Sequence, residues 1–283
     1  PEILIDNRTG TTIKEDKMIG SITSRPLNVI INTNNTSNEF EVYYVDYLCV
    51  NKTHRKKNIA PQLIQTHEYN QSHQNKNISV SLFKREEELT GIIPLTLYKT
   101  SCFNTKMWSK PEQLSPVYSL LTCDKKNIYY FIDFINLMSN TKHNKLDVII
   151  YPSISNLIHL IQTNNLIIKM IIYQGEIVAS YVFRKTQTFI SKDKEILSCI
   201  ASIQDNSKIS NNIFIQSFKN ATWSILKQHI NFNYLSIEDV CDNSFIIANI
   251  ILKTTPIATS PTAYFFYNFA HNPFNNKRCF IIN

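Results

Sequence analysis

The chain has 283 residues, of which 43% are hydrophobic and 18% are charged, and this balance is typical of a globular protein rather than a disordered one. A chain of this length can bury a large core in one or two domains. The net charge of +7 and the pI near 9.0 favour anionic partners, such as a phosphate-rich cofactor, a membrane surface or a nucleic acid. Nucleic acid is the least favoured of these, because the cations are concentrated only at 55–57 and no basic stripe is interleaved with aromatic residues.

The cysteines and histidines argue against a metal site. The six cysteines are dispersed, with no Cys-x-x-Cys pair, and the seven histidines show no pairing at metal-ligand spacing. We therefore expect neither a metal nor a prosthetic group. Reduced thiols and the lack of a signal peptide indicate a cytoplasmic protein, and no apolar run reaches the length of a transmembrane segment. The cysteines are Cys49, Cys102, Cys123, Cys199, Cys241 and Cys279.

Hydrophobic periodicity and turn residues predict a succession of strands and helices. Pro26 should separate two strands, at 17–24 and 27–32, because proline cannot donate to a strand ladder. A polar loop at 32–38 should then lead into a strand at 40–50. Further strands are expected at 77–83, 98–103, 166–173, 177–183, 196–203, 234–238, 263–270 and 278–282, and helices at 58–72, 124–138, 153–163, 211–230 and 243–253.

The connections between these elements predict two similar halves. The strand at 77–83 follows the helix at 58–72, an order typical of a parallel strand pair joined by a crossover helix. A Gln-Gly-Glu turn at 174–176 predicts a hairpin. The proline-containing stretch 108–122 breaks the periodicity and indicates a domain boundary near residue 115, with a β-β-α-β succession on either side.

One segment, 42–64, carries most of the chemical information. An apolar run at 42–50 ends at a polar, basic turn at 51–57, and apolar residues at helical spacing follow from Ile59. This order aims the orphan N–H groups of a first helical turn and three adjacent cations at one point, which is typical of an anion site for the diphosphate of a nucleotide or of coenzyme A. On these residues alone, a surface basic loop between a core strand and a core helix remains an alternative.

The order of residues in this segment is also informative. DYLCVNKTHRKKNIAPQLI, at 46–64, resembles the segment around the catalytic strand of eukaryotic glycylpeptide N-myristoyltransferases, which reads roughly NFLCVHKKLRSKRLAPVLI. Within it, Arg55 to Ala60 resembles the Gln/Arg-x-x-Gly-x-Gly/Ala turn of GNAT-type acyl-CoA transferases, with Asn58 in the place of a glycine. Asparagine is the non-glycine residue that best tolerates left-handed geometry, so this departure is mild. The segments 18–31, 235–253 and 263–270 also resemble the family.

The resemblance implies an α+β fold of GNAT-like mixed sheets flanked by helices, built from two fused pseudo-symmetric GNAT halves. Residues 1–115 would form the N-terminal half, which binds acyl-CoA. Residues 116–283 would form the C-terminal half, which binds the acceptor peptide and supplies the C-terminal carboxylate. Family members have a longer N-terminal portion, so the resemblance implies a short divergent member without it.

The resemblance also implies roles for particular residues. In the family, a bulge in the catalytic strand frees two N–H groups for the thioester oxygen, at the positions of Tyr47 and Leu48 here, and the C-terminal carboxylate is the base, here the α-carboxylate of Asn283. A final core strand explains the apolar end of the chain equally well, as a helix ending at Gly91 explains the segment around Thr90. The implied acyl-CoA contacts are Tyr47, Leu48, Cys49, Val50, Arg55, Lys56, Lys57, Asn58, Ile59, Ala60 and Pro61, and the implied acceptor contacts are Asp46, Thr90 or its neighbour Leu89, Ser202 and Tyr267. Cys49 is expected to be buried in its strand.

The sequence also departs from the family. A glycine-rich motif that lines the peptide site should precede Tyr264, but residues 253–261 read KTTPIATSP, with neither glycine nor aspartate. We hypothesise a monomeric N-myristoyltransferase-like enzyme that uses myristoyl-CoA as co-substrate and acylates N-terminal-glycine proteins or peptides. The alternatives are an inactive acyl-CoA-binding or interaction protein with the same fold, and a GNAT enzyme with a shorter acyl donor.

Overall fold

The computed structural model describes residues 2–5, 12–15, 17–33, 36–87, 91–140, 145–191, 194–229 and 231–283. Its strands are β1 (Glu2–Ile5), β2 (Thr12–Glu15), β3 (Gly20–Thr33), β4 (Thr36–Val50), β5 (Ser81–Glu86), β6 (Thr96–Asn104), β7 (Tyr118–Thr122), β8 (Val148–Pro152), β9 (Leu166–Tyr173), β10 (Glu176–Ser191), β11 (Lys194–Gln204), β12 (Phe232–Glu238), β13 (Ala258–Tyr267) and β14 (Cys279–Ile281). Its helices are α1 (Ile59–Gln74), α2 (Ile128–Ser139), α3 (Ile154–Gln162), α4 (Asn211–Gln228) and α5 (Asn243–Ile251), with 3-10 turns η1 (Lys52–His54) and η2 (Asn276–Arg278).

Twelve of these strands form one mixed sheet in the order β14-β8-β3-β4-β5-β13-β6-β12-β11-β10-β9-β7, while β1 and β2 form a separate hairpin. The expected mixed α+β architecture is therefore confirmed. The sheet is continuous, however, so both proposed halves contribute to one sheet rather than to separate ones. The boundary between residues 115 and 116 stays a prediction.

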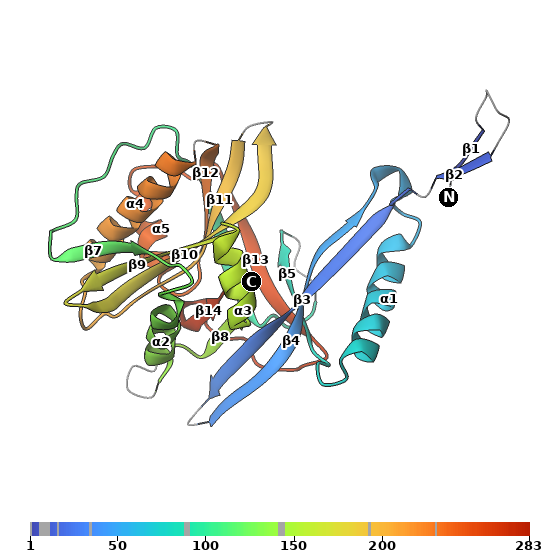
Figure 1. The fold of residues 1–283 in the computed structure, drawn as a ribbon, viewed down its shortest axis with the longest axis horizontal. Coiled ribbons are helices and arrows are strands. Elements are labelled where there is room, and N and C mark those ends of the chain that lie inside the picture. The colour runs from blue at the N-terminus through green and yellow to red at the C-terminus, as the bar shows by residue number, and fades with distance from the viewer. Residues whose placement is uncertain are drawn as a thin grey trace.

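The helices cover both faces of the sheet (Figure 1). Alternate residues of β9 point to opposite faces: Ile168 belongs to the apolar core that includes α2 and α3, and Ile167 to the core that includes α4 and α5. At the other end of the sheet, α1 packs on β3 and β4. Since Ser24 contacts α1 whereas Leu27 lies in the core with α2 and α3, α1 covers the opposite face of β3 from that core.

Several expected connections are confirmed. Strands β4 and β5 are parallel, and α1 lies between them in the sequence, as a crossover requires. Strands β9 and β10 form the expected hairpin, and Gln174 and Gly175 both have positive φ, at 51° and 83°, as a two-residue type I′ turn demands. Helix α3 begins after Ser153 as expected, although the Ser153 hydroxyl makes no capping hydrogen bond.

The prediction that Pro26 divides two strands is wrong, because β3 runs unbroken from Gly20 to Thr33. The N–H of Asn32 points toward β8 and donates to the main-chain oxygen of Asp147. Pro26 lies an even number of residues before Asn32, so its main-chain nitrogen faces the same edge of β3. Strand β8 pairs with β3 only from Leu27 onward. The nitrogen of Pro26 therefore faces an edge of β3 where β8 is not paired, so the lack of an N–H costs no hydrogen bond of the sheet.

The sequence patterns missed other elements as well. The expected loop at 32–38 contains strand on both sides, since β3 ends at Thr33 and β4 begins at Thr36, and these two residues pair. Strand β7 lies inside the stretch interpreted as a boundary, and β8 lies where no element was expected. Both have only five residues, too few for a clear alternation. Within the ranges given above, no helix is long and apolar enough to cross a membrane.

Candidate functional site

The hydrogen-bonded pairing of β4 with β5 ends early, and this defines the centre of the candidate site. The two strands pair only from Tyr43–Val45 to Ser81–Phe83. Beyond that point β4 continues beside β3, whereas β5 continues beside β13. The C-terminal part of β4 therefore has a strand partner on one side only among the residues that the structure describes.

A bulge interrupts β4 immediately after this divergence. Ser21 pairs with Cys49 and Thr23 pairs with Asp46, so Tyr47 and Leu48 together lie opposite one residue of β3. Tyr47 has φ of 52°, a left-handed conformation that costs a non-glycine residue roughly 1–3 kcal/mol. The bulge thus lies at the two positions that the resemblance implies.

The Tyr47 N–H at this bulge is not free. It donates to Oδ1 of Asp46 over 2.9 Å, while the Thr23 hydroxyl donates to the main-chain oxygen of Asp46 over 3.1 Å. The side chains of Tyr47 and Leu48 are exposed. An acyl oxygen that uses the Tyr47 N–H must therefore share or displace the Asp46 carboxylate.

The basic turn after β4 has the geometry of an anion site. Lys56 and Asn58 both adopt left-handed conformations, with φ of 62° and 61°. Asn58 is the N-cap residue of α1, its side chain makes no capping bond, and the first turn of α1 carries no acidic residue. Orphan N–H groups and the positive end of the helix dipole are therefore available beside the exposed cations Arg55, Lys56 and Lys57. The expectation that Asn58 tolerates left-handed geometry is confirmed.

Gly20 fixes the distance between α1 and the sheet. A Cβ atom at Gly20 would lie 2.9 Å from Cδ1 of Leu63 on α1 and 3.1 Å from the main-chain oxygen of Cys49 on β4. Both distances are shorter than ordinary contacts, and the main-chain oxygen of Cys49 would have to shift to admit a Cβ atom, so the close approach here favours glycine. This approach places the N-terminus of α1 next to the end of the bulged strand.

The last residue of the chain is buried against the same strand. Asn283 is 3% exposed, and its side-chain amide is held at both ends. Its Nδ2 donates to the Tyr44 hydroxyl over 2.7 Å, and its Oδ1 accepts from Arg184 over 3.1 Å. Burial is the main cause that raises the pKa of Tyr44 to about 12, so this hydroxyl is neutral at physiological pH.

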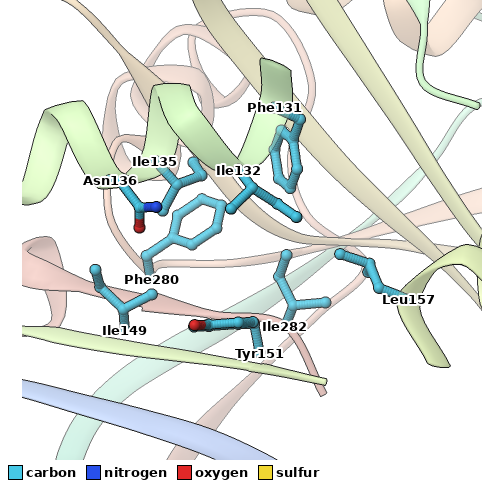
Figure 2. Close-up of a pocket in the computed structure, with 9 residues that line it drawn as sticks. All are labelled: Phe131, Ile132, Ile135, Asn136, Ile149, Tyr151, Leu157, Phe280 and Ile282. Carbon is cyan, nitrogen blue, oxygen red and sulfur yellow. The ribbon is translucent and has the colours of Figure 1, made fainter. Parts of the chain in front are cut away.

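Figure 2 shows the apolar bed next to this chain end, where side chains of β14 and of its parallel neighbour β8 face the helices α2 and α3. The bed encloses a cavity of about 20 Å³, which has room for about one water. Ile282 lies on this bed, and its N–H donates to the main-chain oxygen of Ile150 over 2.7 Å. The residue before Asn283 is therefore anchored firmly. The cavity is lined by Phe131, Ile132, Ile135, Asn136, Ile149, Tyr151, Leu157, Phe280 and Ile282.

Arg184 of β10 joins the chain end to the bulge. One nitrogen of its guanidinium donates to Asn283, and the other lies 3.7 Å from Oδ2 of Asp46. Burial alone would lower the pKa of Arg184, but Tyr44, Tyr47 and Asp46 more than offset this and raise it. Arg184 could not be recognised from the sequence, because a lone arginine in a strand carries no motif.

A buried polar network continues across the sheet from Tyr44. Lys84 of β5 lies 2.9 Å from Glu238 of β12, and the Tyr98 hydroxyl donates to the same carboxylate over 2.5 Å. Tyr264 lies opposite Lys84 in the sheet. The sequence analysis missed these residues too, and the only available signal was a glutamate at the end of an apolar strand, Phe232–Glu238.

The other residues expected to contact the acceptor lie farther from the bulge. Ser202 is fully buried, donates to Asn243 over 2.5 Å, and lies four residues along β11 from Ser198, the partner of Arg184. Tyr267 is 51% exposed at the end of β13, where Glu68 of α1 raises its pKa. Thr90 and Leu89 lie outside the described residues.

Other expected contacts of the acyl-CoA site stay together at the end of β4. Val50 is half-buried at the end of the strand, and Ile59, Ala60 and Pro61 form the first turn of α1. The prediction that Cys49 is buried is wrong, because its side chain is exposed. It follows the bulge, which reorients the side chains at the end of the strand. The structure thus brings the implied acyl-CoA contacts, Asp46 and Asn283 together, and leaves Ser202 and Tyr267 apart from them.

The fold is that of an N-myristoyltransferase. A structure of the enzyme from Saccharomyces cerevisiae with bound myristoyl-CoA matches with a TM-score of 0.69 at 13% identity, over 95% of this chain and 67% of that one. A second structure of the yeast enzyme, with bound myristoyl-CoA and inhibitors, matches with a TM-score of 0.67 at 13% identity, over 95% of this chain and 68% of that one. A third, with bound myristoyl-CoA, gives 0.65 at 13% identity, over 95% and 70%.

A family model also matches part of the sequence. Residues 6–96 match the family model described as myristoyl-CoA:protein N-myristoyltransferase, N-terminal domain. Comparison with curated protein sequences gives no match. The resemblance to glycylpeptide N-myristoyltransferases is therefore confirmed, in sequence over the segment that contains the bulge and the basic turn, and in fold over nearly the whole chain.

Proposed function

We propose that the protein is an N-acyltransferase that transfers a myristoyl group from myristoyl-CoA to the N-terminal glycine amine of a protein or peptide. The observation that carries the proposal is the bulge at Tyr47 and Leu48, located where β4 leaves β5 and just before the cation-flanked start of α1. Such a strand presents main-chain donors to a thioester, and such a helix start binds the diphosphate of the same donor.

The donor side of the proposed site follows from this arrangement. The N–H groups at the start of α1 and the cations Arg55, Lys56 and Lys57 bind the diphosphate of coenzyme A. Cys49 and Val50 contact the part of coenzyme A between its diphosphate and the thioester, because they lie between the bulge and the basic turn. Leu48 and Tyr47 contact the thioester carbonyl. The proposal assigns residues 1–115 to this donor half.

The proposed chemistry is amide formation by direct attack. The amine nitrogen bonds to the thioester carbon, negative charge develops on the carbonyl oxygen, and the C–S bond breaks. Coenzyme A leaves as the thiolate, which takes up the second proton that the nitrogen loses as the neutral amide forms. Main-chain donors at the bulge stabilise the oxygen, by about 2.7–4 kcal/mol for each donor of this kind. A protonated amine cannot attack, so a base must accept its proton.

We assign this base to the α-carboxylate of Asn283 in protein that ends at that residue. Burial of Asn283 and the two bonds of its side chain support the assignment, since they hold the residue beside the bulged strand. The half formed by residues 116–283 binds the acceptor and provides the proposed contacts Ser202 and Tyr267, while the proposed contacts Asp46 and Thr90 come from the donor half. Dispersed free cysteines support a cytoplasmic protein, which we propose acts as a monomer.

Mass spectrometry tests the proposal. The protein is incubated with myristoyl-CoA and a glycine-initiated peptide, with the matching alanine-initiated peptide as control, and the reaction is repeated with acetyl-CoA. Acylation of the glycine peptide by myristoyl-CoA alone is the expected result. Acylation by acetyl-CoA alone would instead establish an enzyme with a shorter acyl donor.

One observation favours a second candidate, an acyl-CoA-binding protein without transferase activity. The Tyr47 N–H, which the transfer reaction needs, already donates to Asp46. If this bond persists with acyl-CoA bound, the thioester carbonyl loses a donor and transfer is slow. A rise in melting temperature with myristoyl-CoA, together with no product from either peptide, would identify this second function.

A further inference from the structure

Arg184 contacts two separate parts of the candidate site, the chain end and the bulged strand. It comes from β10, yet its guanidinium contacts Asn283 at the chain end and lies 3.7 Å from Asp46 on β4. Its side chain is 20% exposed. A planar guanidinium offers five donors in a fixed fork, so it can hold two acceptors at a set separation in a way that a lysine ammonium cannot.

The first of these acceptors controls the bulge. Oδ1 of Asp46 accepts from the Tyr47 N–H, and Oδ2 faces Arg184. The carboxylate therefore has one oxygen on the main-chain donor and the other on the guanidinium. Tyr47 has a left-handed φ that an aromatic residue adopts only under constraint, and the Asp46 carboxylate provides a direct constraint on its N–H.

The second acceptor is the amide of Asn283, whose other end is fixed by Tyr44. Tyr44 and Asp46 are two residues apart in β4, so their side chains point to the same face of the strand. The side chains of Tyr44, Asp46, Arg184 and Asn283 therefore lie close together. Arg184 thus sets the position of the chain end relative to the bulge. In the proposed reaction these two places hold the base and the thioester oxygen.

We propose that Arg184 is a positioning residue for acyl transfer: by bridging Asp46 and Asn283 it holds the bulge donor and the chain end in register. The inference rests on the proposed function and deepens it. Asp46 acts as the adjustable part, because a shift of its carboxylate toward Arg184 releases the Tyr47 N–H to the thioester oxygen. The closer ion pair with Arg184 then replaces the hydrogen bond that the Asp46 carboxylate accepted from the Tyr47 N–H.

The neighbouring charges do not duplicate this role. Arg25 of β3 lies with its guanidinium carbon 5.0 Å from the centre of the Tyr44 ring, in a cation–π arrangement. Lys84 of β5 is paired with Glu238 and Glu86. Among the contacts of the described residues, only Arg184 has an ion pair with Asp46 and a hydrogen bond with Asn283.

The test compares Arg184→Gln, Arg184→Lys, Asp46→Asn and the double variant Asp46→Asn/Arg184→Gln in the full chain. Lys145→Gln is the matched control, because Lys145 forms a similarly buried ion pair with Asp242 rather than with Asp46, at 17% exposure of its side chain. We expect Arg184→Gln to lower kcat about 10–100-fold, the scale of a small misplacement, with the KM for myristoyl-CoA changed less than about twofold. Arg184→Lys should recover part of the loss. The double variant should be no slower than Arg184→Gln, since both act on one unit.

Equal kcat values for Arg184→Gln and Lys145→Gln would overturn the inference, as would strictly additive losses in the double variant. A second readout does not need activity. Exchange of the Tyr47 amide hydrogen, followed by NMR, should be at least about fivefold faster in Asp46→Asn and Arg184→Gln than in Lys145→Gln, because an amide exchanges faster when its bond opens more often. No product from the unsubstituted protein would defeat the proposed function. Unchanged exchange in Arg184→Gln would defeat the positioning role separately.

Discussion

The side-chain amide of Asn283 donates to the Tyr44 hydroxyl over 2.7 Å, and this bond joins the chain end to β4 three residues before the bulge. Both partners are buried, at 3% and 2% exposure. A buried amide that loses its partner retains the cost of leaving water, so this bond restricts where Asn283 can lie. The arrangement brings together two segments, residues 43–50 and 279–283, that lie at opposite ends of the sequence.

Replacing Tyr44 by phenylalanine should lower both stability and turnover. Tyr44→Phe leaves the Asn283 amide without this partner, and we expect the free energy of unfolding to fall by about 1–3 kcal/mol, measured by chemical denaturation. Turnover should fall as well, because the chain end loses its restraint. The control is Tyr181→Phe, since the Tyr181 hydroxyl is equally buried and donates to the main-chain oxygen of Phe214 rather than contacting the chain end. If both variants lose the same fraction of turnover, the bond has no specific role.

Gly20→Ala should push α1 away from β3, because the new methyl group would lie 2.9 Å from Cδ1 of Leu63 on α1. The new methyl group would also lie 3.1 Å from the main-chain oxygen of Cys49, which cannot move without shifting the strand. We expect the free energy of unfolding to fall by about 1–3 kcal/mol and binding of myristoyl-CoA to weaken, as measured by denaturation and calorimetry. Gly91→Ala is the control, because a Cβ atom there meets no atom within 4 Å. Unchanged affinity in Gly20→Ala would show that the position of α1 is not set by this contact.

Asn58 tests the left-handed N-cap. With φ of 61° and ψ of 21°, this residue should accept glycine almost without cost, whereas Asn58→Val should cost about 1–2 kcal/mol. The comparison of Asn58→Gly with Asn58→Val by denaturation measures this difference. Asn58→Gly should also keep its affinity for coenzyme A, since the family turn has glycine there. Equal stability of the two variants would contradict the left-handed geometry.

Acidification should loosen α1. Burial lowers the pKa of His67, whose Nε2 lies 2.9 Å from the Gln71 amide, which also donates to Ser24 on β3. A histidine with a depressed folded-state pKa takes up its proton more readily when unfolded, so its contribution is present above about pH 6.5 and is lost as the pH falls below that. The free energy of unfolding should therefore decrease from pH 7 to pH 5, and His67→Gln should reduce this decrease. The same slope in both proteins would show that His67 does not contribute.

The local part of the site could be predicted from the sequence, because it depends on residues that are neighbours in the chain. The order strand, basic turn and helix within 42–64 predicts the anion site, and the asparagine at position 58 fits the left-handed cap. The family resemblance places the bulge at Tyr47, where the structure has it. The mixed α+β fold follows from the same resemblance.

The distant part of the site could not be predicted. Arg184, Lys84 and Glu238 are single polar residues in strands far apart in the sequence. Arg184 reaches Asp46 although β10 is not adjacent to β4 in the strand order, and Lys84 reaches Glu238 although β13 and β6 lie between their strands. The bond from the Tyr47 N–H to Asp46 depends on the exact turn of the bulge, which no residue pattern encodes. Such contacts require three-dimensional coordinates.

The most direct test of the central claim compares turnover of a glycine-initiated peptide by protein ending at Asn283 with turnover by protein carrying one extra glycine after it. Extension moves the carboxylate away from the buried position of Asn283. The account predicts that turnover falls by at least about 100-fold, the scale of losing a general base, while the affinity for myristoyl-CoA stays the same. Equal turnover in the two proteins would contradict the account, because the base would then lie elsewhere.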